Sequence, residues 1–311
     1  MSDKINQLDN YTKTNVKNKD SFFRFLFGTD KARALELYNA VNGSDYKDSS
    51  ELTINTLHDV IYMKMKNDVS ILFGKQLVLY EHQSTVNPNM PLRGLMYASE
   101  LYSKIFGSDP HIYSTALMRI PRPRYFVLYN GESKGWSDEV VKIRLSDMFS
   151  EPVPEDETGD FEWTATVINI NPGKNTEIKN RSVTLSGYCY FIERIRELKK
   201  SYSEDEAVDL AVQQCIDEGV LADILREQRS EVKRMLLTEF DEVAYREMLL
   251  EEGREEGREE GMKEGLEQGK LLEIVESILA GDYTMERGAE KAGMSAPELR
   301  EYARKQLQKE I

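Results

Sequence analysis

The chain has 311 residues, of which 40% are hydrophobic and 9% are aromatic. This composition is sufficient for a packed core and excludes a collagen-like or wholly disordered chain. The length exceeds the roughly 100 to 200 residues of one typical domain, so we expect a main domain with appended segments. No apolar run is long enough for a membrane span and residues 1–20 lack a signal-peptide pattern, so we expect a cytoplasmic protein with no membrane partner. The two cysteines, Cys189 and Cys215, exclude a disulfide framework.

The formal net charge of −14 is distributed unevenly along the chain. Residues 1–150 carry 19 Lys or Arg against 17 Asp or Glu, and residues 151–200 carry 7 against 9. Residues 201–311 carry 15 against 29, so the acidity belongs to the last third. Because the first 200 residues are neutral overall, a local basic surface for phosphate contacts is compatible with the composition.

Helix and strand patterns alternate along the first half of the chain, which predicts an α/β domain. Apolar residues at helical spacing predict helices at Ser21–Phe27, Ala32–Val41 and Leu92–Phe106. Runs of β-branched and aromatic residues predict strands. The predicted strands cover Val60–Met65, Val69–Phe73, Gln76–Gln83, Tyr125–Tyr129, Val140–Leu145 and Thr164–Ile170. Asn130-Gly131 predicts a turn, and from Leu185 onward the pattern is helical.

Residues 251–270 repeat a glycine at every fourth position, from Gly253 to Gly269. In a helix these glycines lie on one face, along which a second helix could approach closely. The alternative is a solvated linker, because each interior glycine costs about 1 kcal/mol relative to alanine. The sequence therefore predicts either a helical arm or a linker, followed by a small helical tail at 271–311.

The two strands that flank Gly74-Lys75 are predicted to form a hairpin. If this hairpin turns symmetrically, paired residues have numbers that sum to 149, so Asp68 lies opposite Glu81. Gln83 then shares the face of Glu81, whereas His82 points to the other face. Two carboxylates directly opposite each other repel unless a cation lies between them, which favours a metal site. The alternative is an exposed or salt-bridged strand end, with the register displaced by one residue.

The hairpin also carries the most specific motif of the chain, E-H-Q-S-T at Glu81–Thr85, within the segment Asn67–Arg93. This segment resembles the Rpn family of recombination-promoting nucleases, also called YhgA-like transposases, in the PD-(D/E)XK nuclease superfamily. Lys19–Gly28, Tyr129–Gly131, Leu145–Phe149 and the glycine-spaced acidic tail share the resemblance, which covers most of the chain.

The resemblance implies a restriction-endonuclease-like core, in which a mixed sheet is flanked by helices, followed by an α-helical C-terminal region. The expected segments are a polar leader at 1–14, the nuclease-like core at 15–185, a helical region at 186–250, the glycine-spaced linker or arm at 251–270 and the helical tail at 271–311. The chemistry is then expected within the α/β part of the chain.

The superfamily pattern pairs an Asp at the start of the second core strand with E-x-K on the third strand. Asp68, Glu81 and Gln83 match these positions, with Gln in place of Lys. The resemblance implies that Asp68 and Glu81 bind Mg²⁺, for which Mn²⁺ can substitute, and that the backbone carbonyl of His82 is a further ligand. A neutral amide at Gln83 can orient the attacking water but adds no positive charge, which affects the rate rather than the mechanism.

Five further charged residues are candidates for supporting roles. Arg93 lies in the first turn of a predicted helix, where its charge and the helix N-terminus could meet a DNA phosphate. Lys75 and Lys66 are further candidates for phosphate contacts. Glu36 or Asp20 could supply the acidic side chain that the superfamily often places on its first core helix. The alternatives are a surface glutamate at Glu36 and a helix N-cap at Asp20.

These observations predict a Mg²⁺-dependent DNA endonuclease that hydrolyses phosphodiester bonds and is linked to recombination or mobile elements. A second hypothesis is a catalytically weak or inactive nuclease fold that binds DNA or assembles proteins, and the Gln83 substitution favours it. A transposase that joins DNA strands is a third hypothesis, suggested by the second name of the family. The C-terminal helices are candidates for homo-oligomer formation.

Overall fold

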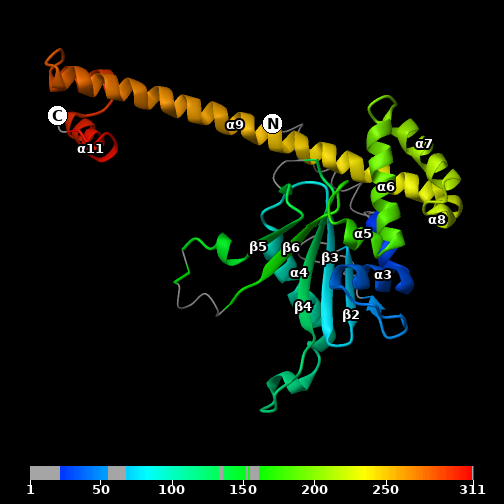
Figure 1. The fold of residues 1–311 in the computed structure, drawn as a ribbon. Coiled ribbons are helices and arrows are strands. Elements are labelled where there is room, and N and C mark those ends of the chain that lie inside the picture. The colour runs from blue at the N-terminus through cyan, green and yellow to red at the C-terminus, as the bar shows by residue number, and fades with distance from the viewer. Residues whose placement is uncertain (1–21, 55–67, 133–135, 152, 155–160, 310) are drawn as a thin grey trace. The chain divides into compact units, whose positions relative to one another are not determined.

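The computed structural model describes residues 22–54, 68–132, 136–151, 153–154, 161–309 and 311 (Figure 1). The chain divides into two compact units, Met1–Val243 and Ala244–Ile311. Within the described residues, no helix combines the length and the apolar character that a membrane crossing requires. The predicted strand at Val60–Met65 lies outside the described residues.

The secondary structure consists of strands, α-helices and short 3-10 helices. The strands are β1 (Thr53–Ile54), β2 (Val69–Phe73), β3 (Gln76–Gln83), β4 (Arg122–Tyr129), β5 (Val140–Arg144) and β6 (Thr164–Asn169). The α-helices are α2 (Phe22–Gly28), α3 (Lys31–Asn42), α4 (Met90–Phe106), α5 (Thr176–Asn180), α6 (Val183–Leu198), α7 (Glu204–Asp217), α8 (Ala222–Glu227), α9 (Arg229–Leu279), α10 (Met285–Ala292) and α11 (Ala296–Gln306). The 3-10 helices are η1 (Pro110–Tyr113) and η3 (Ser146–Met148).

The strands form one mixed sheet in the order β1-β2-β3-β4-β6-β5. Strands β3, β4 and β6 are parallel, whereas β2 and β5 run antiparallel to their neighbours. The register of β2 and β3 runs from Val69 opposite Tyr80 to Phe73 opposite Gln76, so paired numbers sum to 149 as predicted. The α/β class and the hairpin register are confirmed. Strand β1 has only two residues, too few to carry a sequence pattern.

Two apolar clusters cover the opposite faces of this sheet, and the alternation of β3 separates them. Val78 and Tyr80 belong to the cluster that includes α2, α3 and α6. Leu77 and Leu79 belong to the cluster that includes α4. Figure 1 shows α3 and α4 on opposite sides of the sheet. Helices α7, α8 and the start of α9 pack on the first cluster, which explains why the first unit extends to Val243.

Helix α4 packs closely against the sheet at Gly94. A Cβ atom at Gly94 would lie 2.3 Å from the ring of Tyr125 on β4, nearer than two carbon atoms can pack. Pro91 lies in the first turn of α4, where the missing N–H has no helical partner to lose. This contact holds the first turn of α4, with Arg93, against the ends of β2 and β3.

The predicted turn at Asn130-Gly131 does not form, since residues 130–132 have an irregular conformation and β6 separates β4 from β5. Gly131 is required for another reason. A Cβ atom there would lie 1.9 Å from the carbonyl oxygen of Ser84, so only glycine allows the two backbones to approach this closely.

In the second unit, the glycine repeat at 251–270 is part of helix α9. A Cβ atom at any of its five glycines, from Gly253 to Gly269, would meet nothing within 4 Å. Beyond the repeat, Val275 packs with Ala289 of α10 and Leu299 of α11 in a small core. The corner between α10 and α11 contains Gly293 with a φ of 66°.

We expect Gly94→Ala to lower the free energy of unfolding of the first unit by about 1–3 kcal/mol, because the added methyl group overpacks the Tyr125 ring. Gly261→Ala is the matched control, since its methyl group enters open space and alanine favours the helix by about 1 kcal/mol. Urea unfolding followed by circular dichroism measures both variants. A Gly94→Ala protein at least as stable as the wild type would contradict the close packing of α4.

Candidate active site

Two carboxylates meet at one end of the β2–β3 hairpin. Asp68 immediately precedes β2, and the register places it opposite Glu81 of β3. The Oδ2 atom of Asp68 accepts a hydrogen bond of 2.7 Å from the backbone N–H of His82. Glu81 is only 3% exposed, so its charge is removed from bulk water. The structure therefore brings the two predicted carboxylates together.

Arg93 compensates part of this negative charge. Its Nη2 atom donates hydrogen bonds to Glu81 Oε1 and, at 3.1 Å, to the hydroxyl of Tyr97. Burial alone would lower the pKa of Arg93, but the Glu81 carboxylate outweighs burial and the pKa is raised. Arg93 is thus a cation held beside Glu81, in the first turn of α4 where the sequence placed it. Its contact with a DNA phosphate stays a prediction.

Gln83 lies on the same face of β3 as Glu81, as the alternation of the strand predicts. Its Nε2 atom lies 3.5 Å from Glu81 Oε1, and its side chain is buried. The intervening His82 points to the opposite face, where its ring stacks on Phe23 with a centroid distance of 5.7 Å. The amide of Gln83 is therefore next to the Glu81 carboxylate.

Tyr97 and Tyr125, which the sequence pattern did not indicate, lie on the same face as Glu81. Tyr97 follows Arg93 by one helical turn, so the spacing within α4 could have indicated it. Burial and the Glu81 carboxylate raise the pKa of Tyr97 to about 12 and that of Tyr125 well above its usual value. The hydroxyl of Tyr125 is buried and has no hydrogen-bond partner within the described part of the chain. Both phenols therefore stay protonated at neutral pH.

On the opposite face, His82 links the hairpin to distant helices. Its Nε2 atom lies 3.0 Å from the hydroxyl of Tyr188 on α6, and its Nδ1 atom lies 3.3 Å from Glu239 Oε1 on α9. Burial lowers the pKa of His82, but the Glu239 carboxylate and then Asp68 outweigh it, so the pKa is raised. Burial also raises the pKa of Asp68, against the lowering effect of the His82 N–H. No sequence pattern connects Glu239 with the hairpin.

The donor atoms at this end of the hairpin match those that Mg²⁺ uses. Mg²⁺ binds through one or two carboxylates and keeps several waters, whereas structural zinc and calcium sites take more protein ligands. Within the described ranges, no three His, Cys, Asp or Glu side chains are gathered so that they could hold a metal ion. In an extended strand the N–H and C=O of one residue point to the same side, so the His82 carbonyl faces the side of Asp68. Asp68, Glu81 and this carbonyl could hold a hydrated ion.

Of the other predicted residues, the structure describes Lys75 and Glu36, and neither lies beside the carboxylates. Lys75 lies in the β2–β3 turn, six strand positions from Glu81 and so about 20 Å away. Lys75 therefore lies at the opposite end of the hairpin from the carboxylates, and its contact with a phosphate stays a prediction. Asp20 and Lys66 lie outside the described residues.

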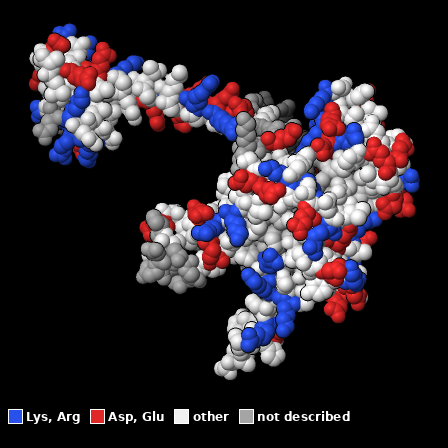
Figure 2. Space-filling model, viewed as in Figure 1, with Lys and Arg blue, Asp and Glu red and all other residues white. Residues whose placement is uncertain are grey.

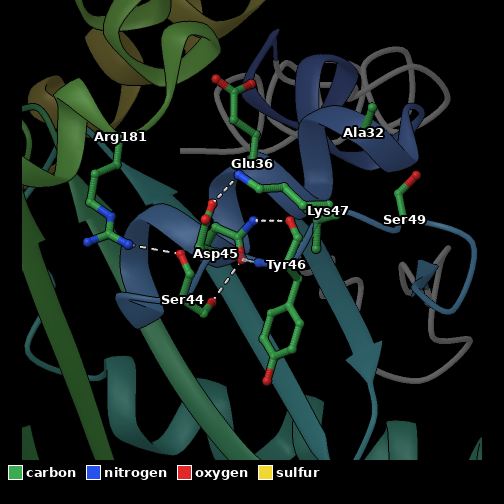
Figure 3. A pocket seen from close by; sticks show the side chains of 10 residues that line it. Ala32, Glu36, Ser44, Asp45, Tyr46, Lys47, Ser49 and Arg181 are labelled. Atoms are coloured by element: carbon green, nitrogen blue, oxygen red, sulfur yellow. Dashed lines mark hydrogen bonds and ion pairs between the residues drawn. The ribbon is translucent and has the colours of Figure 1, made fainter.

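Glu36 of α3 lines a pocket, together with Tyr46 and Arg181 (Figure 3). Its carboxylate accepts hydrogen bonds from the backbone N–H and the hydroxyl of Thr184, at 3.1 and 2.6 Å. The pocket has a volume of about 510 Å³, and Figure 3 shows Glu36 pointing away from the Tyr46 ring across it. Lys47 pairs with Asp45 at its rim. Glu36 therefore serves the junction of α3 and α6 in this structure.

No family model matches the chain, and no curated protein or solved structure matches it either. The fold and the site together define an α/β protein in which a half-buried and a buried carboxylate meet at the end of a hairpin in a mixed sheet.

We expect Glu239→Gln to lower the free energy of unfolding more at about pH 5.5 than at about pH 8.5. The folded pKa of His82 is raised, so the His82–Glu239 pair stabilises the fold fully below the unfolded pKa of about 6.5. That stabilisation is lost as the pH rises through the folded pKa. Urea unfolding in EDTA at both pH values measures the difference.

Glu218→Gln is the control. Glu218 accepts a hydrogen bond from the Tyr190 hydroxyl and pairs with Arg194, and neither tyrosine nor arginine titrates between about pH 5.5 and 8.5. A destabilisation by Glu239→Gln that is the same at both pH values would show that the pair does not depend on His82 protonation.

Proposed function

We propose that this protein is a Mg²⁺-dependent DNA endonuclease with a restriction-endonuclease-like core of the PD-(D/E)XK type. The observation that carries the proposal is the pair of half-buried Asp68 and buried Glu81, opposite each other at one hairpin end, with Gln83 on the same face. A structural sheet has no use for two facing carboxylates, because like charges at directly opposed positions destabilise strand pairing. The mixed sheet with helices on both faces is consistent with such a core.

When bound, Mg²⁺ supplies a Lewis acid for the phosphate and lowers the pKa of a water molecule. Asp68 and Glu81 hold the ion, together with the backbone carbonyl of His82. Gln83 orients the attacking water through its amide. The charge of Arg93 offsets the repulsion between the carboxylates and an incoming phosphate.

The hydroxyl of Tyr125 supports a polar occupant at this site. It is buried, and its pKa responds to the charges of Glu81, Arg93 and Asp68, so it lies within their field. A buried hydroxyl without a partner costs about 1–3 kcal/mol. A water molecule or a phosphate oxygen beside the carboxylates would satisfy it, and it would then donate a hydrogen bond to that oxygen.

A second candidate function is a nuclease fold that binds DNA without cutting it. The specific observation in its favour is the ion pair of Arg93 with Glu81, which already provides one positive charge at the carboxylates. In this candidate the arginine takes the place of the metal ion, and the neutral Gln83 is a second departure from a hydrolytic site. A role in recombination and self-association through the C-terminal helices stay predictions in both candidates.

The wild-type protein is expected to nick supercoiled plasmid DNA in Mg²⁺ or Mn²⁺ and to be inactive in EDTA. Asp68→Asn and Glu81→Gln should each lower the rate by about 100-fold or more, since each removes a charged ligand of the ion. The change in melting temperature on adding Mg²⁺ should be positive for the wild type and absent in Asp68→Asn.

Glu218→Gln, which changes an acid in the helical region, is expected to cut like the wild type. Equal rates in all variants would trace the activity to a contaminant and reject the proposal. DNA binding with neither cutting nor a thermal shift would favour the second candidate.

Gln83→Lys is expected to raise the single-turnover rate of cleavage by about tenfold or more, because an ammonium group adds the positive charge that a neutral amide lacks. Gln83→Met keeps the approximate volume but cannot orient water, so it should lower the rate. Rates are compared at saturating Mg²⁺. A slower Gln83→Lys and an unaffected Gln83→Met would remove Gln83 from the site.

A further inference from the structure

The connection between α4 and β4, residues 107–121, is an exposed segment with large apolar side chains at its surface. Tyr113 is 91% exposed and Leu117 is 79% exposed, and Ile112 and Ile120 are also exposed. Figure 1 shows this segment, called here the α4–β4 arm, extending away from the sheet at the start of β4. Apolar side chains gathered at such exposure are typical of an interaction site.

The second half of the arm and the start of β4 are basic, in contrast to the acidic chain as a whole. Residues 110–124 contain three arginines and neither Asp nor Glu, in a chain with a net charge of −14. Arg119 and Arg122 are exposed, and the backbone N–H of Arg122 donates a hydrogen bond of 2.8 Å to the carbonyl of Lys75. Figure 2 shows Lys and Arg side chains gathered where this projection leaves the body. The arm therefore joins exposed apolar groups to a cationic base.

Local contacts hold the arm in a defined conformation. Asp109 caps helix η1, accepting a hydrogen bond of 2.9 Å from the backbone N–H of His111, and so fixes the turn that presents Tyr113. At the other end, the hydroxyl of Tyr102 donates a hydrogen bond of 2.5 Å to the carbonyl of Pro121. A segment held in this way loses little conformational freedom when it binds.

The third arginine, Arg124, has a structural role. It donates a hydrogen bond to Asn42, and its guanidinium lies 4.7 Å from the centre of the Phe126 ring. The exposed cations at the base of the arm are Arg119, Arg122 and Lys75.

We propose that the α4–β4 arm is a second DNA-binding element, separate from the carboxylate site. Arginine next to exposed apolar residues matches proteins that neutralise phosphates and insert apolar side chains between bases. Arg119, Arg122 and Lys75 contact phosphates, and Tyr113 and Leu117 contact bases.

The choice of DNA as the ligand rests on the proposed function. The hairpin places the base of the arm about 20 Å from Glu81, close to the length of six base pairs. A duplex that is cut at the carboxylates would therefore also contact the α4–β4 arm, about half a turn of the DNA helix from the cut.

The test measures binding of the full chain to a 30-base-pair duplex by fluorescence anisotropy, in EDTA and over a range of salt concentrations. Arg119→Gln/Arg122→Gln should weaken binding and reduce the slope of log K against log salt by about 2, because two phosphate contacts are lost. Lys200→Gln/Arg226→Gln removes two exposed cations from the helical region and serves as the control that binds like the wild type.

Tyr113→Ser/Leu117→Ser should weaken binding at least about fivefold with an unchanged salt slope, because stacking rather than charge is lost. The matched control is Tyr202→Ser/Leu210→Ser, which changes an exposed tyrosine and an exposed leucine elsewhere. Circular dichroism spectra equal to that of the wild type show that each variant is folded.

Wild-type affinity in both arm variants, or a wild type that does not bind DNA, would overturn the inference. It would also be overturned if the substitutions abolished self-association in light scattering, or binding to phosphatidylserine vesicles, while DNA affinity stayed unchanged. Arm-dependent binding without metal-dependent cutting would reject the nuclease proposal alone. Metal-dependent cutting with arm-independent binding would reject the arm alone.

Discussion

Two acidic side chains facing each other across a hairpin repel, and the surroundings of Asp68 and Glu81 are arranged around that repulsion. The His82 N–H holds one carboxylate and Arg93 pairs with the other. The close packing of α4 at Gly94 makes the second contact available, because it brings the first turn of the helix to the strand ends. A hydrated divalent ion fits the same arrangement, since it would add positive charge between the two carboxylates.

The single residue His82 connects the two faces of the sheet. Its backbone N–H contacts Asp68, while its ring is enclosed by Phe23 and Tyr188 and is paired with Glu239. Helices α6 and α9 therefore support the strand that carries the carboxylates. The helical region therefore supports the site. A substitution of Glu239, near the start of α9, would alter the contacts of His82, whose backbone N–H donates a hydrogen bond to Asp68.

The two ends of the β2–β3 hairpin differ in chemistry. One end gathers two carboxylates, an amide and tyrosines, whereas the other end gathers exposed cations beside the apolar α4–β4 arm. The proposed metal site and the proposed DNA-binding arm use these two ends separately. Lys75 illustrates the division, because it lies in the β2–β3 turn, at the end of the hairpin away from Glu81.

The sequence alone determined the strands of the hairpin, their register and the faces of Glu81, Gln83 and His82, because these follow from a two-residue turn and strict alternation. It also indicated the helices on either side of the hairpin. Contacts between distant segments were decided by tertiary structure alone. The pairing of Arg93 with Glu81 requires α4 to cross β4 at a glycine, and Glu239 reaches His82 only because α9 packs on the same core. Local patterns specify which side a residue faces, whereas long-range packing specifies which residue meets it there.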